Sequence, residues 1–504
     1  MFGPDTRRTD DMRSLVVLTF VALLGGCMVG PDYARPDFDL PAAFQYKDAE
    51  ARETADIDWW EQFQDPMLDR LITEALSNNR NIGIAAANIE QAAGVLMQAR
   101  SPLFPQAGYS GTGARERASE AEDSLFSSIL SNPRNSYQAF AGASWEIDLW
   151  GRIRRLSESA QAELSATEEA WRGVILSLVS SVASNYIQLL GLDEQLRISE
   201  ETLATYAESV KLFDLRFQYG QVSQMTLEQA RSRYETAAAA IPQIESQIAQ
   251  VENSLSILLA RNPEPVERGK TIHQLHLPPV PPDLPSDLLV NRPDIQQAEQ
   301  NLISANARIG AVKALYFPTI SLTGAFGFAS MELHNLFERP SRAWNYAGSI
   351  TGPIFTGGAI HGQVKQAEAI RKAALLNYAQ TVQNSFADVE NALVARKKLV
   401  EQIRAQERLV KANREYVRLA RLQYEGGYLP YSTVLQAEQQ LFPSELDYSR
   451  YRTSLFISLV NIYKAMGGGW ITEAERLTLQ KGTNEDTGRV HFLTTPPASN
   501  ESIH

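Results

Sequence analysis

The sequence predicts a mainly α-helical protein that also supplies β-strands to a membrane, built as an internal two-fold repeat. Three observations support this fold class. Segments of the two halves align without gaps, four short segments alternate with a period of two, and each second strand precedes a heptad pattern longer than an ordinary globular helix.

The first element is a targeting segment, predicted over residues 1–26. An apolar run at 15–24 follows Arg13 and has the length of a signal-peptide core, which is too short to span a membrane as a helix. Because residues 1–11 suit such a leader poorly, we expect Met12 to be the true start.

Cys27 is the only cysteine in the chain, so it forms no intramolecular disulfide. Its position directly after Gly25 and Gly26 is similar to the lipobox of bacterial lipoproteins. We therefore expect Cys27 to carry N-palmitoyl and S-diacylglycerol groups, with a buried structural cysteine as the alternative. Met28 stands where an Asp commonly marks retention in the inner membrane, which favours the outer membrane.

The bulk composition limits which partners the chain can bind and how it can cross a membrane. The formal net charge of −12 makes nucleic acid an unfavourable partner. We read no apolar run after Leu24 as approaching the ~20 residues of a membrane helix, so any membrane crossing is expected to use strands.

The repeat relates most of the chain. Residues 88–105 align with 301–318, 148–151 with 354–357, and four positions around the first predicted turn with four around the second. These last positions are Phe217, Gly220, Thr226 and Ala230, matched by Tyr424, Gly427, Thr433 and Ala437. Each half thus reads as helix, strand pair, very long helix, tight turn and helix.

The predicted strands are 105–114, 137–149, 318–328 and 344–354, each with the length of a tilted transmembrane strand. Trp145 and Trp344 are candidate membrane-interface residues, and the connections 115–136 and 329–343 are expected to be extracellular loops. A soluble sandwich is the alternative. Four strands do not close a barrel, so a membrane role requires several copies, and a trimer leaves a wider lumen than a dimer.

The long helices are predicted over 152–219 and 357–424, each about 100 Å long at 1.5 Å per residue. Leu189, Leu196, Leu203, Val210 and Phe217 recur every seven residues, which alone indicates a coiled coil. The chain is expected to turn back at Gly220 and at Gly426 and Gly427. Pro242 and Pro443 are expected to kink the returning helices.

At this point the chain resembles the TolC-like outer-membrane efflux lipoproteins of NodT type, which serve resistance-nodulation-division pumps. The resemblance covers nearly all of the chain after the leader and rests on motifs in a fixed order. They are 27–33, Arg35-Pro36, Trp59-Trp60, Asp65-Pro66, Asn78-Asn79, 148–152 (DLWGR), 284–289, 292–295 (RPDI), Phe317-Pro318 and 352–355 (GPIF).

The resemblance implies a homotrimer with a β-barrel of four strands per protomer, a long periplasmic α-helical barrel and a mixed equatorial domain. The expected divisions are a lipoprotein signal peptide at 1–26, a lipidated segment and equatorial wrap at 27–66, a first repeat at 67–261, a connector at 262–292, a second repeat at 293–467 and a tail at 468–504.

The family also implies site residues. The periplasmic tip and gate would comprise Gly220, Gly426, Gly427, Tyr428, Leu429 and Tyr431. Relatives often carry an acidic residue in this turn and 427–432 has none, so we expect a hydrophobic gate narrowed by Tyr428 and Leu429. Arg152, Arg154 and Arg155 follow the second strand and are candidates for contact with outer-membrane lipid, with an ordinary solvated face as the alternative.

The implied function is that of a passive outer-membrane channel, the exit duct of a tripartite efflux system for drugs or other toxic small molecules. Its implied partners are a periplasmic membrane-fusion adaptor and an inner-membrane resistance-nodulation-division pump. A type I protein secretion duct and a non-conducting structural envelope lipoprotein are the alternatives. The sequence does not specify the substrate.

We expect no enzyme, cofactor or metal, because the chain lacks G-x-S-x-G, Walker and H-E-x-x-H motifs. His273 and His276 are the only close histidine pair, and a surface loop is favoured over a zinc site there.

Overall fold

A computed structural model of the chain describes residues 28–38, 44–46, 59–117, 119, 133–278, 280 and 292–467. The predicted leader, Cys27 and the tail 468–504 lie outside these residues. The chain divides into two compact units. Unit 1 comprises Met1–Asp39, Ala86–Ala170 and Asp294–Val382, and unit 2 comprises Leu40–Ala85, Trp171–Pro293 and Gln383–His504.

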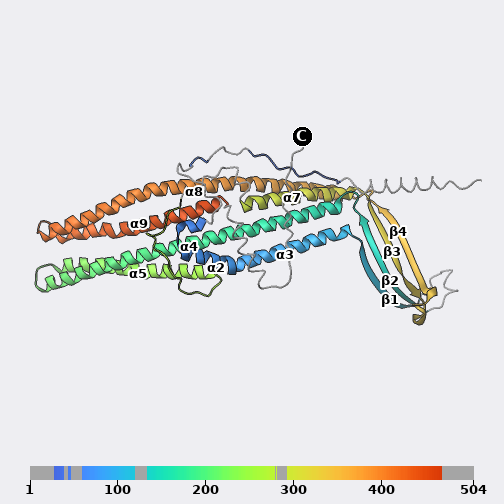
Figure 1. The fold of residues 1–504 in the computed structure, drawn as a ribbon, viewed down its shortest axis with the longest axis horizontal. Coiled ribbons are helices and arrows are strands. Elements are labelled where there is room, and N and C mark those ends of the chain that lie inside the picture. Colours follow the sequence, from blue (N-terminus) through green and yellow to red (C-terminus); the bar gives the residue numbers. More distant parts are fainter. Residues whose placement is uncertain are drawn as a thin grey trace, which may run out of the picture. The chain divides into compact units, whose positions relative to one another are not determined.

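The first helix or strand of the described chain is a 3-10 turn, η1 (Trp59–Phe63) (Figure 1). The first half continues with α2 (Pro66–Asn78), α3 (Arg80–Arg100), η2 (Ser101–Leu103), β1 (Gln106–Glu116), β2 (Arg134–Ile147), α4 (Arg152–Gln218) and α5 (Gln224–Leu258). The second half contains α7 (Pro293–Lys313), η4 (Ala314–Tyr316), β3 (Thr319–Ser330), η5 (Leu333–Asn335), η6 (Arg339–Ser341), β4 (Arg342–Thr351), α8 (Ala359–Glu425) and α9 (Tyr431–Ala465).

The element lengths confirm the predicted repeat. Helices α4 and α8 each contain 67 residues, α5 and α9 each contain 35, and α3 and α7 each contain 21. The predicted long helices are confirmed to within two residues at each end. Pro242 and Pro443 lie inside α5 and α9, each of which continues as one α-helix past its proline.

One row of the predicted heptad seam is buried throughout, whereas the other row is buried at Leu189 and exposed at Phe217. Leu192, Ser199, Tyr206 and Phe213 are buried, whereas Phe217 of the other row is 39 % exposed. A helix of this length therefore keeps apolar side chains uncovered by its own chain.

The core of unit 2 is built on the middle of α4. Val179, Val182, Tyr186, Ile187 and Leu189 are fully buried there. Within the described residues, α4 also contains an 18-residue window with a mean hydropathy of 1.5, of which 61 % is buried. Our expectation that no stretch after Leu24 is apolar enough for a membrane helix is therefore wrong by this measure, and the burial shows that the stretch forms core.

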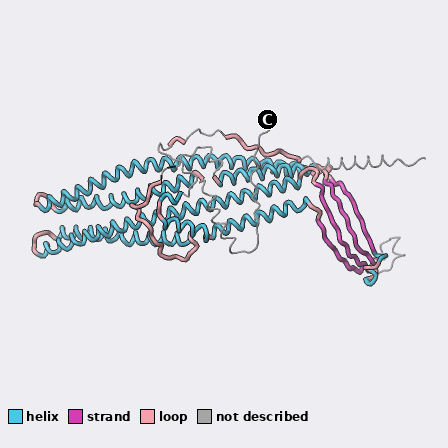
Figure 2. Tube along the Cα trace, in the orientation of Figure 1, coloured by secondary structure: helices cyan, strands magenta, loops and turns pink. Residues whose placement is uncertain are grey.

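The four strands form one antiparallel sheet in the order β1-β2-β3-β4 (Figure 2). All four predicted strands are confirmed, and the structure adds the pairing of β2 with β3, in which Ala143 faces Gly324. This pairing joins the two repeats. In the described chain β1 and β4 each pair on one side only, so the sheet has two open edges.

Candidate functional site

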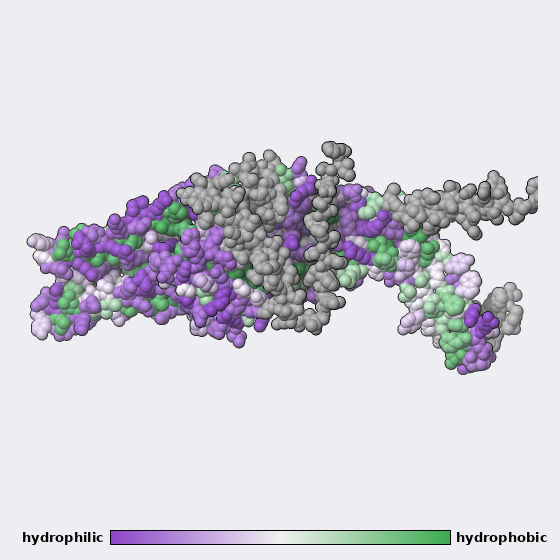
Figure 3. Space-filling view, viewed as in Figure 1, coloured by the Kyte–Doolittle hydropathy of each residue, from purple (hydrophilic) through white to green (hydrophobic). Residues whose placement is uncertain are grey.

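The sheet has two chemically different faces. Directly paired residues of antiparallel strands point to the same side, and residues alternate along each strand. The register therefore places large apolar side chains together on one face, with Tyr346 81 %, Trp344 67 % and Phe326 54 % exposed. This apolar face comprises Tyr109, Tyr137, Ala139, Ala141, Ala143, Trp145, Ile147, Ile320, Leu322, Phe326, Phe328, Trp344, Tyr346 and Ile350. Figure 3 shows hydrophobic surface over the strands.

The opposite, polar face carries mainly Ser, Thr, Gln, Asn, Gly and Ala. Ser110, Gln138, Glu146, Thr323 and Asn345 belong to it. One face of the sheet thus carries exposed apolar side chains, and the opposite face carries small and polar ones. Strands of a membrane barrel alternate in this way, with apolar residues toward lipid and polar residues toward water. The two predicted interface tryptophans lie on the apolar face near opposite ends of the strands, Trp145 at the helix end and Trp344 at the loop end.

The three candidate arginines all form ion pairs. Arg152 bonds Glu146 through Nε and Nη2 at 2.8 to 3.2 Å, and Arg154 Nε lies 3.3 Å from Asp148 Oδ2. Arg155 is only 2 % exposed, and its guanidinium reaches Asp32 at 2.7 Å and Glu158 at 2.8 Å. A side chain that is 2 % exposed touches neither lipid nor bulk water, so Arg155 fits neither the predicted lipid contact nor a solvated face.

Arg155 instead fixes an extended N-terminal segment, residues 28–38, which we call the strap. A Cβ on Gly30, at φ +105°, would lie 2.4 Å from Gly310 Cα of α7, so only glycine allows the two backbones to meet. Farther along α7, Asn306 donates to the Pro31 carbonyl at 2.9 Å, and Tyr33 donates to Glu299 at 2.9 Å. The sequence predicts a lipidated segment and equatorial wrap over 27–66 but not the contacts of the strap with α4 and α7.

The first residue of the strap lies at the junction of β2 and α4. The Met28 side chain lies against Gly151, and Val29 N donates to the Trp150 carbonyl at 3.1 Å. By chain connection, the predicted lipidation residue Cys27 directly precedes this contact.

The two tip turns have the same backbone structure. Gly220 and Gly427 have φ of +68° and +76°. Gly220 N donates to Phe217 O and Gly427 N to Tyr424 O, and the next residues donate to Arg216 O and Gln423 O. This is a Schellman ending at equivalent repeat positions, and it requires glycine because other residues disfavour left-handed φ.

The side chains of the second turn point in different directions. Tyr428 is 83 % exposed and Leu429 is half-buried. Tyr431 is only 9 % exposed and lies 3.9 Å from the Phe213 ring and 5.2 Å from the Tyr424 ring. Burial raises the pKa of Tyr431 to about 12. Tyr431 is therefore buried in this turn, unlike the exposed Tyr428, and its role at the tip and gate stays a prediction.

Arg216 joins the two hairpins at this tip. It donates from Nη1 to the Tyr424 hydroxyl at 2.5 Å, and its guanidinium lies 5.8 Å from the Phe213 ring centroid. The packing of Phe213, Tyr424 and Tyr431 with this cation links the first hairpin (α4 and α5) to the second (α8 and α9).

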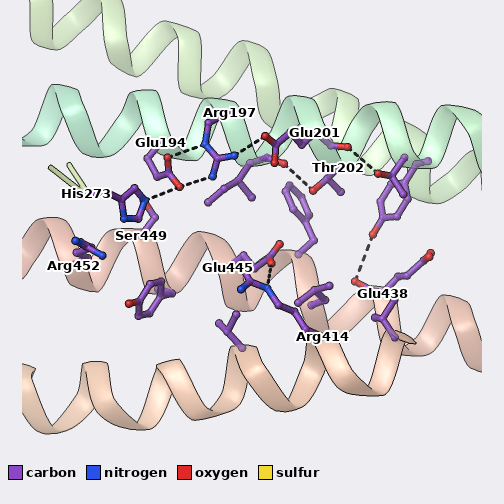
Figure 4. Close-up of a pocket in the computed structure, with 18 of the residues that line it drawn as sticks. Glu194, Arg197, Glu201, Thr202, His273, Arg414, Glu438, Glu445, Ser449 and Arg452 are labelled. Atoms are coloured by element: carbon purple, nitrogen blue, oxygen red, sulfur yellow. Dashed lines mark hydrogen bonds and ion pairs between the residues drawn. The ribbon is translucent and has the colours of Figure 1, made fainter. Parts of the chain in front are cut away.

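A cavity of about 500 Å³ in unit 2 lies between α4 and helices α8 and α9 (Figure 4). Glu194 lines it, and Oε1 lies 2.7 Å from Arg197 and 3.0 Å from His273. Burial alone would raise the pKa of Glu194, but the hydrogen bonds from Arg197 and His273 outweigh it and hold that pKa below its ordinary value.

The two histidines do not converge on one site. His273 faces Glu194, whereas Nδ1 of His276 lies 3.1 Å from the Gln62 carbonyl. Among the described residues, no group of three or more His, Cys, Asp or Glu side chains is arranged to hold a metal ion.

Comparison with known proteins identifies a family, similar relatives and a similar solved structure. Residues 71–261 and 284–468 match the model of a family described as outer membrane efflux protein. The chain is 35 % identical over 490 residues to the toluene efflux pump outer membrane protein TtgC of Pseudomonas putida, covering 95 % of this chain and 100 % of TtgC. It is 33 % identical over 458 residues to the cation efflux system protein CusC of Escherichia coli, covering 89 % and 96 %.

Among solved structures, the fold is similar to that of the CmeC outer membrane channel of Campylobacter jejuni. The TM-score is 0.84 at 26 % sequence identity, with 92 % of this chain and 99 % of that chain covered.

Proposed function

The chain belongs to the outer membrane efflux protein family and is an outer-membrane channel of an efflux system, and from this premise we propose its assembly, anchor and cargo. In this proposal three copies form one duct. The duct receives solutes from a periplasmic adaptor and an inner-membrane resistance-nodulation-division pump, and releases them outside the cell. The resemblance to TolC-like proteins and the physics of the sheet support it.

The observation that carries the proposal is the two-faced sheet with two open edges. An apolar face suits lipid, but an open edge in lipid leaves backbone N–H and C=O groups unpaired at a cost of several kcal/mol each. Joining β4 of one copy to β1 of the next removes every edge. Three copies give about twelve strands and put the polar face around a lumen.

For the cargo we propose small organic compounds such as drugs or solvents. TtgC is named for toluene efflux and CusC for cation efflux, and the identity to TtgC is slightly higher. The channel itself supplies no energy in this proposal, so the pump drives transport. The relatives favour efflux over the protein-secretion and structural-tether alternatives.

The test combines conduction with partner capture. Purified protein in planar bilayers should give discrete channels, and a photo-crosslinker at exposed position 428 should capture an adaptor of a proton-driven pump in living cells. Position 431 is the matched control, because its side chain is buried and should capture little. Protein that never conducts would refute the duct, and capture of an ATP-driven secretion adaptor would favour the secretion alternative.

We further assign the lipid anchor to Cys27. Its neighbour Met28 is held at the β2–α4 junction, so an acyl chain on Cys27 would start beside the membrane end of the helices. The expected result is incorporation of labelled palmitate by the parent and none by Cys27→Ser. Equal labelling of both would contradict the assignment.

A further inference from the structure

A second cavity, of about 620 Å³, lies entirely in unit 1 and is lined by α3, α4, α7 and α8. Most of its lining positions correspond between the two repeats. Gln98 and Ala311 are equivalent, as are Ser159 and Gln366, and Glu163 and Ile370. Both repeats therefore turn the same helix face toward this cavity.

This correspondence indicates which side of the helix layer faces the axis of the duct. In a ring assembled from copies that each contain two repeats, equivalent positions face the same side of the wall. A curved layer of helices encloses space on its concave side, and that side faces the axis of a closed ring. The lining of this cavity is accordingly the inner wall of the duct, an assignment that rests on the proposed function.

The same wall continues onto the sheet. Arg152 lines the cavity, and its Nη2 lies 2.8 and 2.9 Å from the two carboxylate oxygens of Glu146. Glu146 pairs with Ser321, which pairs with Ser349, so it lies on the polar face. The polar sheet face and the helix face around the cavity thus form one surface.

Each carboxylate at this part of the wall has a guanidinium partner. Glu146 pairs with Arg152, both side chains being just over a quarter exposed, and Glu163 pairs with Arg308. All four lie beside water-filled space in a duct, where an uncompensated charge enriches the opposite ion and depletes the like ion. The opposite charges of an ion pair cancel most of each other's potential in the lumen. Salt screens what remains beyond a Debye length, which is ~10 Å at 0.1 M salt.

We propose that Arg152 and Arg308 are charge-compensating residues of the duct wall. They neutralise Glu146 and Glu163, so that this stretch passes solutes of either charge and leaves selection to other parts of the machine. In a trimer each pair occurs three times, and removing one guanidinium type exposes three carboxylates around the lumen.

The test measures the reversal potential of single channels in a KCl gradient. Arg152→Gln should raise the ratio of K⁺ to Cl⁻ permeability by roughly twofold to fivefold, as expected for a change in wall potential of about 0.35 to 0.8 kT, because the same potential enriches K⁺ and depletes Cl⁻. Glu146→Gln should lower the ratio, and the double variant Glu146→Gln with Arg152→Gln should return it to the parent value. Arg308→Gln should act like Arg152→Gln.

Arg154→Gln is the matched control, because it removes the same charge two residues away and Arg154 does not line the cavity. A shift in Arg152→Gln no larger than that in Arg154→Gln overturns the assignment while leaving the duct intact. If Arg152→Gln does not assemble, Glu146→Gln and the double variant decide. A double variant that keeps the lowered K⁺ to Cl⁻ ratio of Glu146→Gln, instead of returning to the parent ratio, also overturns the assignment. Absence of channels in the parent would instead refute the proposed function.

Discussion

Arg155 carries a buried charge whose partners come from two elements, the strap and its own helix. Replacing it with Met keeps much of the side-chain volume but leaves Glu158 and the Val29 carbonyl without their donor. Because Asp32 is 92 % exposed and remains hydrated, we expect a loss of about 2 kcal/mol, below the 3 to 5 typical of a fully buried pair.

The strap should then be cut by protease at 28–38 several times faster in Arg155→Met than in the parent. Arg154→Met is the control, since that side chain is 33 % exposed and its guanidinium pairs with Asp148 rather than with Asp32. Equal cutting of all three proteins would show that Arg155 does not hold the strap.

Glu194 gives the molecule an acid-sensitive contact. Its pKa is lowered in the folded protein, so ionised Glu194 stabilises the fold fully above its unfolded pKa, and this stabilisation is lost as pH falls through the folded pKa. The midpoint of thermal unfolding in detergent should therefore fall below about pH 4.5 more steeply in the parent than in Glu194→Gln. Parallel curves for the two proteins over pH 3 to 7 would contradict this.

Single residues show where the sequence stops being informative. The turn glycines could be predicted, because a helix that reverses needs a residue with left-handed φ. The burial of Arg155 and Tyr431 could not, because it depends on contacts with Asp32 and Phe213, which lie far away in sequence. Arginine after a strand and tyrosine in a turn are ordinarily exposed, and tertiary packing reverses that here.

At the scale of elements, the second tip turn carries both an exposed side chain, Tyr428, and a buried one, Tyr431. If Tyr428 and Leu429 narrow the closed duct, Tyr428→Ala and Leu429→Gly should each increase single-channel conductance, since both enlarge the opening. Conductance equal to that of the parent in both variants would exclude a constriction at this turn.

Tyr431→Ala should instead loosen the link between the two hairpins. Truncating a buried aromatic side chain costs about 3 to 5 kcal/mol, and Tyr431 packs on Phe213 and Tyr424. The variant should melt at a lower temperature, while Tyr431→Phe, which keeps the ring, should melt near the parent. A Tyr431→Ala protein as stable as the parent would contradict the packing argument.

The two faces of β3 supply a matched test of the membrane assignment. Phe326→Arg places a charge on the apolar face, where it should cost about 2 to 4 kcal/mol at the depth of the bilayer centre. Thr323→Arg places the same charge on the polar face of the same strand and should be tolerated. The measurement is the amount of heat-resistant oligomer in outer-membrane fractions, and equal amounts from both variants would refute the assignment.

The elements themselves were predictable because each has a single dominant period. Period two delimited β2 and β3, and the uninterrupted heptads delimited α4 and α8, with no proline in either long helix. The pairing of β2 with β3 was not predictable, since the two strands are separated by the whole first hairpin and no local signal sets their register. The contacts of the strap were not predictable either, because an extended segment has no period that indicates what it packs against.

At the scale of the whole molecule, the described chain exposes surfaces that a single copy does not cover. The sheet keeps two open edges, and the hairpins expose leucines at equivalent repeat positions, Leu212 with Leu419 and Leu215 with Leu422. Equivalent exposed positions in both repeats are expected when each hairpin has a neighbour on the same side in a ring. The internal repeat thus lets a few copies supply many similar neighbours.

The number of copies follows from the lumen that the polar face requires. Two copies would give about eight strands, and the interior of an eight-stranded barrel is largely filled by side chains, whereas twelve strands leave a water-filled passage. Native mass spectrometry of detergent-extracted protein should therefore show three times the mass of the processed chain, and the same preparation should conduct ions. A conducting dimer would contradict this, because it would place Phe140, Gln138 and their neighbours in a lumen too narrow for water.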